Sequence, residues 1–371
     1  MALLGISLIM ILAWAGLTHF CFPQKIVFKE SLLQSSIATI FAVVVIGGLY
    51  YTDMKDFSII NGHITDKKSV KVSCSHSYDC FCYESCSGSG ENRSCHEVCQ
   101  TCYEHDYDVD WRVFSTVGTW NINRVNRQGT KMPPRWDAVV IGEPASNVVA
   151  NINYIKAAPD SLFRDSDKSI TQQFANLIPK YPKIFDYYRF NRIIELGVKY
   201  PEATELNNRL SLELRELGPA KQVNILVFFV NTPDPNYRYA IEREWLGGKK
   251  NDVIVLFGID NDAKMLWTDI ITFGRNSGNE LLSIKLKDNI TQLVNDEQFT
   301  SAEMLSNAII RVVSTDFKRK EMKNFEYLKD DYSISMKALF WYIGLQLIIL
   351  LGTTILFYHK DIFDDNNFRR Y

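Results

Sequence analysis

The longest uncharged apolar run of the chain lies near its C-terminal end. Residues 338–358 carry no charged side chain and are numerous enough for a helix that crosses the hydrocarbon core of a bilayer. Phe340, Trp341 and Tyr358 place aromatic rings near both ends of the run, as membrane interfaces favour. The pattern predicts a transmembrane helix over residues 338–358.

Two further apolar runs, residues 3–22 and 32–51, are separated only by the linker PQKIVFKES. A linker of this length suits a hairpin turn, so the pair predicts two antiparallel transmembrane helices. A cleaved signal peptide is the alternative for the first run. Met1 and Ala2 provide no basic segment, however, and no small-x-small cleavage site stands near Thr18 to Phe22.

Basic residues in the short connections indicate how the spans are oriented. Lys25 and Lys29 lie in the first linker, and Lys360, Arg369 and Arg370 lie after the last span. Short loops rich in Lys and Arg face the cytoplasm, which places the segment between the second and third spans outside. The basic stretch FKRKEMK on the domain side argues for the opposite orientation. The expected partners are the lipid bilayer and other membrane or envelope proteins.

Between the spans, residues 52–145 alternate between apolar and polar positions in short runs that indicate β-strands. The stretch SIINGHIT predicts a strand, an Asn-Gly turn and a second strand, and DAVVIG predicts a further strand. Residues 165–317 read differently. Fully apolar strands such as VNILVFFV and DVIVLFGI alternate with helical patterns such as ATELNNRLSLELREL, which predicts an α/β domain. A helical pattern is also assigned to YYRFNRIIELGVKY, residues 187–200.

Composition excludes one class of partner. The 371 residues are 46% hydrophobic with a formal net charge of -2, so the chain can bury a core, and its Lys and Arg are dispersed among acids. Binding to nucleic acid requires a concentrated basic surface. No nucleic-acid partner is therefore expected.

Seven of the eight cysteines fall between residues 74 and 102, within the predicted β region, and three histidines lie between residues 74 and 111. The candidates for disulfides are Cys74, Cys80, Cys82, Cys86, Cys95, Cys99 and Cys102. Their odd number leaves one unpaired, since Cys21 lies in a predicted span. Zinc is the second interpretation, with Cys99, Cys102 and His105 as one group of ligands. Either Cys74 with His76, or Cys80 with Cys82 and Cys86, would supply the second group. A mixture of the two is the third.

Acids alternate with apolar residues directly after this segment. Asp106, Asp108 and Asp110 would share one face of a strand whose other face carries Tyr107, Val109 and Trp111. A calcium loop also begins with alternating acids, but the Gly bend and the distal Glu that it needs are missing. A half-buried strand is the preferred interpretation.

The predicted α/β half resembles the TPM domain, a module of membrane-anchored envelope proteins. The resemblance rests on ELRELGPAKQVNILVFFVNT and YAIEREWLGGKKNDVIVLFGIDNDAKMLWTDIITFGRNSG, within residues 207–290. It implies an α/β/α sandwich on the extracytoplasmic side and a link to metal ions and phosphatase activity. Two positions depart from the family pattern: Asn251-Asp252 stands in place of Asn-Gly, and Phe273-Gly274-Arg275 in place of Gly-x-Gly.

A phosphatase of this type would need carboxylates that converge on calcium or magnesium. Asp260 and Asp262 follow a buried strand, and Asp252 and Asp269 could approach them from neighbouring strand ends. A hairpin turn built from Asp and Asn explains the same residues.

The sequence thus predicts an α/β fold, a TPM-like α/β/α sandwich, with a cysteine-rich β region and three transmembrane helices. The leading interpretation of its function is a non-enzymatic extracytoplasmic binding or assembly module. A metal-dependent phosphatase is the first alternative, and a zinc-binding scaffold that faces the cytoplasm is the second.

Overall fold

The structure is a computed structural model that describes residues 2–23, 25–87, 94–158, 169–273, 278–332 and 334–360. It divides into two compact units. A helical unit comprises residues Met1–Asp56, Ala150–Ser166 and Glu321–Tyr371, and a sheet unit comprises Phe57–Val149 and Asp167–Lys320. Each unit is described by itself.

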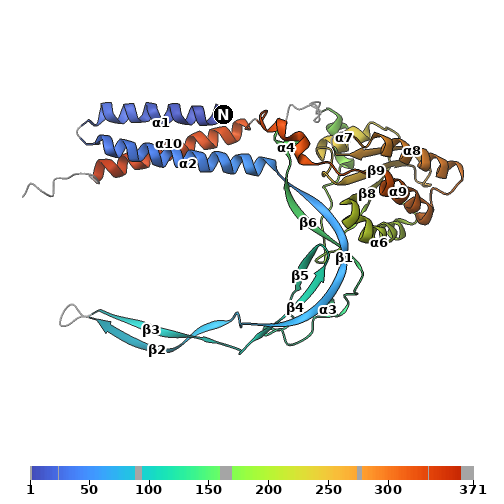
Figure 1. Cartoon of the computed structure of the whole chain (residues 1–371), viewed down its shortest axis with the longest axis horizontal. Coiled ribbons are helices and arrows are strands. Elements are labelled where there is room, and N and C mark those ends of the chain that lie inside the picture. The colour runs from blue at the N-terminus through green and yellow to red at the C-terminus, as the bar shows by residue number, and fades with distance from the viewer. Residues whose placement is uncertain are drawn as a thin grey trace, which may run out of the picture. The chain divides into compact units, whose positions relative to one another are not determined.

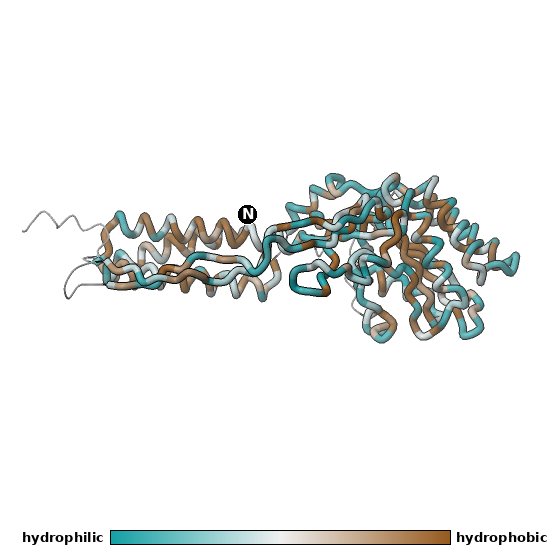
Figure 2. The backbone as a smooth tube through the Cα atoms, turned by 90° about the horizontal axis from the view of Figure 1, so that it is seen from below, coloured by the Kyte–Doolittle hydropathy of each residue, from teal (hydrophilic) through white to brown (hydrophobic). Residues whose placement is uncertain are grey.

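The helical unit contains three long helices that lie side by side (Figure 1): α1 (Ala2–Cys21), α2 (Phe28–Met54) and α10 (Met336–His359). All three are long and apolar enough to span a membrane, and hydrophobic residues run along each of them in Figure 2. Polar contacts join them. The Gln34 side chain of α2 donates to the Leu350 carbonyl at 2.8 Å, and the Trp14 indole of α1 donates to Thr354 at 2.9 Å. Such bonds hold helices together where no water competes.

Two short helical segments complete this unit, α4 (Tyr154–Ala157) and η3 (Met322–Lys329). Asn153 caps α4 and also donates to the Asp56 carboxylate at 2.9 Å. The Tyr332 hydroxyl donates to Asp53 at the end of α2 at 2.8 Å.

The first sheet of the sheet unit has the strand order β5-β4-β1-β6. Its strands are β1 (Lys55–Val72), β4 (Asp108–Ser115), β5 (Gly118–Ile122) and β6 (Pro144–Ile152). The pairs β1–β4 and β4–β5 are antiparallel. A small core of Ile64, Trp111 and Val113 forms against this sheet.

Two expectations for this region are wrong. The strand β1 runs through Asn61 and Gly62 without a turn, because the buried Asn61 side chain donates to the Val223 carbonyl at 2.9 Å. Gly62 serves close packing there, since a Cβ would lie 2.0 Å from the Thr116 hydroxyl. The stretch DAVVIG forms the end of a short helix, α3 (Pro134–Asp137), and a turn that precedes β6.

The second sheet has the order β10-β9-β8-β7, with β7 (Ile193–Leu196), β8 (Asn224–Val230) and β9 (Asp252–Ile259) parallel and β10 (Met265–Thr272) antiparallel to β9. Every residue of β8 and β9 is buried. This agrees with the apolar runs, which predict strands covered on both faces.

Helices cover both faces of this second sheet. On one face, Ile225, Val227 and Phe229 of β8 contact apolar residues of α6 (Ala203–Lys221), α8 (Glu280–Asn295) and α9 (Ala302–Asp316). On the other face, Leu226, Phe228 and Val230 contact the region of α5 (Ser169–Gln173), η2 (Ala175–Leu177) and α7 (Tyr237–Glu244). The alternation of β8 therefore defines two cores, and Figure 1 shows the helices around the sheet.

The helix expected over residues 187–200 is wrong. An isolated bridge joins Phe185 and Arg189, and the apolar residues Ile193 and Ile194 belong to β7, where they pair with Val227 and Phe228 of β8. A strand at this position completes the parallel sheet, and this long-range pairing outweighs the local helical pattern.

A buried polar network lies at the N-terminal ends of β8 and β9. Asn224 accepts from the Arg192 guanidinium at 2.6 Å and donates to the Asp252 carboxylate at 2.9 Å. The Tyr181 hydroxyl and the Lys249 backbone N–H also donate to Asp252. Burial raises the pKa of Asp252 to about 6, although these hydrogen bonds oppose the shift.

This shift predicts a pH dependence of stability. A carboxyl with a raised pKa binds its proton more tightly in the folded state. Its contribution to the stability of the fold is fully present below the pKa of the unfolded state and is lost as pH rises through about 6. We expect the difference in unfolding free energy between the wild type and Asp252→Asn to shift in favour of the variant by on the order of 3 kcal/mol between pH 4 and pH 7. Urea unfolding followed by tryptophan fluorescence at several pH values tests this. A difference that is independent of pH would contradict it.

Candidate functional site

The hairpin formed by β2 (Ser77–Ser87) and β3 (Ser94–Tyr103) is a separate two-stranded sheet. Three pairs of cysteines lie at disulfide distance across it: Cys80–Cys102, Cys82–Cys99 and Cys86–Cys95. Cys86 and Cys95 are direct partners in the antiparallel register, which places their Cα atoms 3.9 Å apart. The prediction of a cysteine-rich, disulfide-bearing β region is confirmed, and Cys74 is the cysteine of this segment that stays unpaired.

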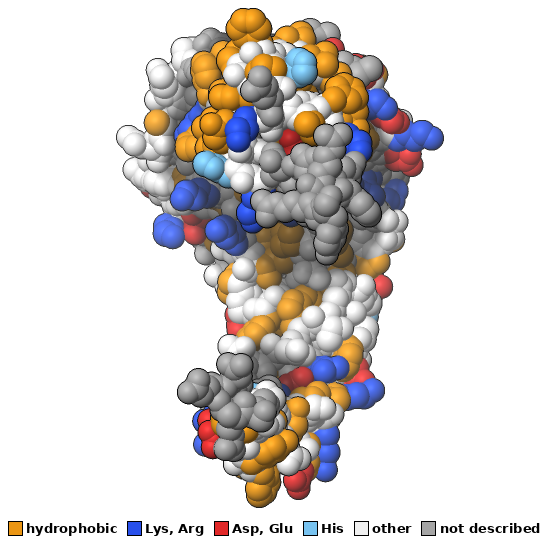
Figure 3. Space-filling view, turned by 90° about the vertical axis from the view of Figure 1, so that its left-hand side faces the viewer, with side chains coloured by type: hydrophobic (Ala, Val, Ile, Leu, Met, Phe, Trp, Pro, Cys, Tyr) orange, Lys and Arg blue, Asp and Glu red, His pale blue; other side chains and the backbone are white. Residues whose placement is uncertain are grey.

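The hairpin exposes large aromatic side chains. Tyr78, Phe81, Tyr83 and Tyr103 are 52%, 79%, 62% and 59% exposed. Phe81 lies in an irregularity of the ladder between Cys80 and Tyr83 and has a positive φ of 48°. In the space-filling view, hydrophobic side chains are visible at the hairpin end of the molecule (Figure 3).

The charged side chains on the described strands of the hairpin, with histidine taken as neutral, are all acidic. These described strands include the acids Asp79, Glu84 and Glu97 and no Lys or Arg. Glu84 and Glu97 are direct cross-strand partners. Like charges at such positions repel each other, so this pair favours a positively charged neighbour.

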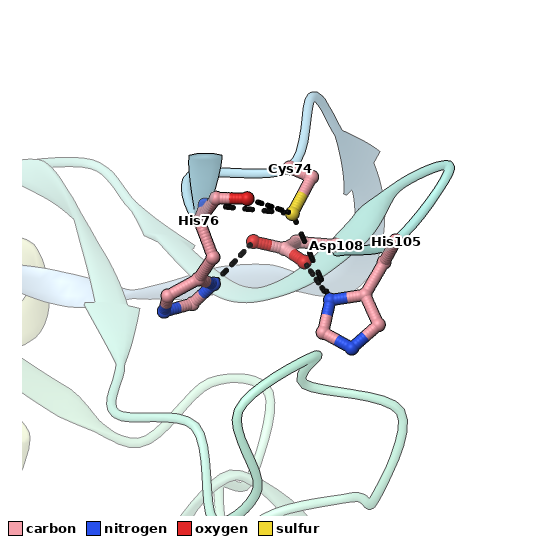
Figure 4. Close-up of side chains that lie close together, drawn as sticks. All are labelled: Cys74, His76, His105 and Asp108. Carbon is pink, nitrogen blue, oxygen red and sulfur yellow. Dashed lines mark hydrogen bonds and ion pairs between the residues drawn. The ribbon is translucent and has the colours of Figure 1, made fainter. Parts of the chain in front are cut away.

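A second cluster lies at the root of the hairpin. The β1–β4 ladder ends at the pair Val72 and Asp108, and the β2–β3 ladder begins at Ser77 and Tyr103. Cys74 and His76 lie on the strand that leaves the first sheet, and His105 and Asp108 lie on the strand that returns to it. We call these four residues the root cluster. Figure 4 shows their side chains turned toward one another.

The four candidate ligand atoms of the root cluster all lie within 4.8 Å of one another. The Cys74 sulfur is 3.7 Å from the His105 Nδ1 atom. The Asp108 carboxylate lies between the two imidazoles, with its Oδ1 atom 3.4 Å from the His105 Nδ1 and its Oδ2 atom 3.7 Å from the His76 Nδ1. Cys74 and Asp108 are buried, and about a quarter of each histidine side chain is exposed.

Neighbouring residues fix the Asp108 carboxylate through one of its oxygens. The Ser75 backbone N–H and hydroxyl donate to Oδ2 at 3.0 and 3.1 Å, and the Arg124 guanidinium donates to it at 2.7 Å. These donors, the Ser75 N–H above all, hold the pKa of Asp108 well below its usual range. The same arginine binds Asp110 at 2.7 Å, so the two acids share one face of β4, as the alternating pattern predicts.

The structure separates the residues that the sequence suggests as zinc ligands. Cys99 and Cys102 pair with Cys82 and Cys80, whereas Cys74, His76 and His105 meet in the root cluster. Sequence reasoning misses Asp108 as their fourth member, because its alternating neighbours favour a strand face. The signal that could find it is the spacing His105-x-x-Asp108 opposite Cys74-x-His76, once the two strands are known to be adjacent.

The carboxylates considered for a phosphatase lie apart in the structure. Asp260 and Asp262 belong to the turn between β9 and β10, where an Asp260 oxygen accepts from the backbone N–H groups of Asp262 and Lys264 at 3.0 and 2.9 Å. Asp252 is at the other end of the eight-residue strand β9, a separation of roughly 25 Å at about 3.3 Å per residue. Asp269 forms ion pairs with Lys287 at 2.7 Å and Arg238 at 3.4 Å.

Comparison with known families, curated proteins and solved structures finds no match to this chain. The resemblance to the TPM domain therefore stays a prediction.

Proposed function

We propose that the protein is a membrane-anchored, extracytoplasmic binding or assembly module whose binding element is the β2–β3 hairpin. The observation that carries the proposal is the series of three cysteine pairs along a ribbon with no fully buried residue in its described strands. An isolated two-stranded ribbon is marginally stable, and disulfides can stabilise it only in an oxidising compartment. The basic residues in the linker between α1 and α2 and after α10 support the same orientation.

The surface of the hairpin indicates which partner fits it. Tyrosine and phenylalanine are enriched at protein–protein interfaces, and tyrosine is enriched at binding hot spots. Both strands of a two-stranded ribbon are edge strands, with backbone groups free to pair with an extended segment. Because the described hairpin residues carry acids without Lys or Arg, the partner is expected to be a basic, extended segment of another membrane or envelope protein.

A metal-dependent phosphatase of the TPM type is the less favoured function. Asp260 is engaged by its own turn, and Asp252 lies at the opposite end of β9. A zinc-binding scaffold that faces the cytoplasm is also less favoured, because disulfides in the hairpin would not persist in that compartment.

Charge reversal on the hairpin tests the proposal. A photoreactive amino acid in place of Tyr83, in the full-length protein in native membranes, is expected to form a discrete adduct with one partner protein. The variant Glu84→Lys/Glu97→Lys should reduce the yield of this adduct at least about tenfold, because two attractive contacts become repulsive. Glu213→Lys/Glu216→Lys, on the exposed face of α6, is the matched control and should leave the yield unchanged. An adduct that is insensitive to the reversal, or no adduct at all, would contradict the proposed function.

A further inference from the structure

We propose that the root cluster of Cys74, His76, His105 and Asp108 binds one zinc ion. A thiolate, two imidazoles and a carboxylate are the ligand types that zinc takes in proteins, and four of them complete a tetrahedral site. Calcium and magnesium prefer oxygen ligands alone. The combination of sulfur, nitrogen and oxygen therefore selects zinc over the hard cations.

The distances between the ligand atoms suit a tetrahedron. Zinc bonds of about 2.3 Å to sulfur and about 2.0 Å to nitrogen or oxygen imply separations of about 3.3–3.5 Å between neighbouring ligand atoms. The separations in the root cluster are 3.7 Å from the Cys74 sulfur to the His105 Nδ1 and 3.4 Å from this Nδ1 to the Asp108 Oδ1. One ligand atom from each of the four residues, His76 included, lies within 4.8 Å of the others. Side-chain rotations that shorten these separations would bring one atom of each residue into coordination.

The hydrogen bonds around Asp108 leave one oxygen for a metal. Three donors from Ser75 and Arg124 occupy Oδ2, whereas Oδ1 is buried and accepts no hydrogen bond within the described parts of the chain. The buried Nδ1 atom of His76 likewise makes no hydrogen bond to any residue that the structure describes. Buried polar atoms of this kind are rare in folded proteins unless a metal or water satisfies them. Donors on the second oxygen of a ligating carboxylate are typical of metal sites, where they orient the ligand.

The position of the site indicates what zinc would do. Two of the ligands come from each of the two strands, between the last pair of the β1–β4 ladder, which includes Asp108, and the first pair of the β2–β3 ladder. A single ion would therefore cross-link the two strands between the ladders, where a backbone hydrogen bond from Glu104 to the His76 carbonyl at 3.1 Å also joins them. Zinc would fix the root of the hairpin, as the three cysteine pairs fix its length.

Zinc binding can be measured on the full-length protein in detergent, purified without a polyhistidine tag. After incubation with zinc and dialysis, metal analysis should find about one zinc per chain. Cobalt substitution should give the d–d bands of a tetrahedral site and a thiolate charge-transfer band. Cys74→Ser should abolish the charge-transfer band, and His105→Asn should lower zinc occupancy at least about tenfold. His96→Asn, an exposed histidine on β3, is the matched control and should retain full occupancy.

A second measurement does not depend on a substitution in the site. In a Cys21→Ser background, zinc should slow alkylation of Cys74 by iodoacetamide at least about tenfold, and a chelator should restore the rate. The proposal is overturned if the wild type retains no zinc, if Cys74→Ser binds zinc as the wild type does, or if zinc leaves the alkylation rate unchanged. Intact zinc binding without the Tyr83 adduct would overturn the binding function of the hairpin alone.

Discussion

Replacing Arg192 by lysine is expected to lower the free energy of unfolding of the sheet unit by about 3 kcal/mol. The Arg192 side chain is buried and donates to four oxygens: Asn224 and Asn61 at 2.6 Å each, Ser211 at 3.2 Å and Ser146 at 3.3 Å. A lysine ammonium is a compact group that cannot reproduce the planar fork of a guanidinium. Asn61 and Asn224 keep a second donor each, from Ser146 and from the Asn61 amide. At least two of the four hydrogen bonds from the charged guanidinium would still be lost, at about 1.5–3 kcal/mol each.

The position of Arg192 in the network explains why it is sensitive. Burial lowers the pKa of its guanidinium to about 9. The Asn224 side chain accepts a hydrogen bond from this guanidinium and donates one to the Asp252 carboxylate, so it connects the two charged groups. Asn61 and Ser146 belong to the first sheet and Asn224 to the second, so one side chain links the two sheets of the unit.

Urea unfolding of the detergent-solubilised protein, followed by tryptophan fluorescence, provides the measurement. Arg189→Lys is the matched control. Arg189 is more exposed and forms ion pairs with Asp186 at 3.6 Å and Glu143 at 3.9 Å, so its replacement should cost less than about 1 kcal/mol. Equal losses in the two variants would show that the buried network contributes nothing specific.

Local pattern was sufficient to predict the elements that bury a continuous or periodic apolar surface. The runs VNILVFFV and DVIVLFGI form β8 and β9, and ATELNNRLSLELREL lies within α6, whose Leu206, Leu210 and Leu214 recur at the helical period and are buried together. The three long apolar helices follow from the same physics, because their length and lack of charge are properties of the sequence alone.

The predictions failed where a distant partner decides the conformation. Asn61-Gly62 has the composition of a tight turn. In the structure, however, the Asn61 side chain accepts a hydrogen bond from Arg192, and a side chain at position 62 would clash with Thr116. Neither requirement is visible in the eight residues around them. The strand β7 was mistaken for a helix for the same reason, since its partner β8 lies about 30 residues further along the chain.

The candidate site was only partly predictable. The odd number of cysteines required one to stay unpaired, but the register of the hairpin decides that it is Cys74. Cys99-x-x-Cys102 has the spacing of a zinc ligand pair, yet each of these residues has a cysteine across the ribbon. Asp108 lies near Cys74 because β1 and β4 pair in a register whose last pair is Val72 and Asp108, and Cys74 follows Val72 by two residues.

Opening all three disulfides is expected to unfold the hairpin while the rest of the sheet unit stays folded. The outermost bond, Cys80–Cys102, closes a loop with a sequence separation of 22 and is worth about 3 kcal/mol on the chain-entropy model, and the nested bonds add less. A decrease of about 3 kcal/mol in the unfolding free energy raises the population of the unfolded hairpin more than about a hundredfold. The described hairpin strands contain no buried residue, so no packed core would hold the hairpin together once the cross-links are opened.

Limited digestion with chymotrypsin, with and without a phosphine reductant, measures this effect. Cleavage after Phe81 and Tyr83 should accelerate at least about a hundredfold on reduction, because a protease needs a locally unfolded segment. Cleavage after the buried Phe228 and Phe229 of β8 should stay slow, since both belong to cores that contain no cysteine. Cys86→Ser/Cys95→Ser, which keeps the two outer bonds, should remain resistant. If reduction leaves cleavage at Phe81 unchanged, backbone pairing alone holds the hairpin, and the disulfides would no longer support an extracytoplasmic binding element.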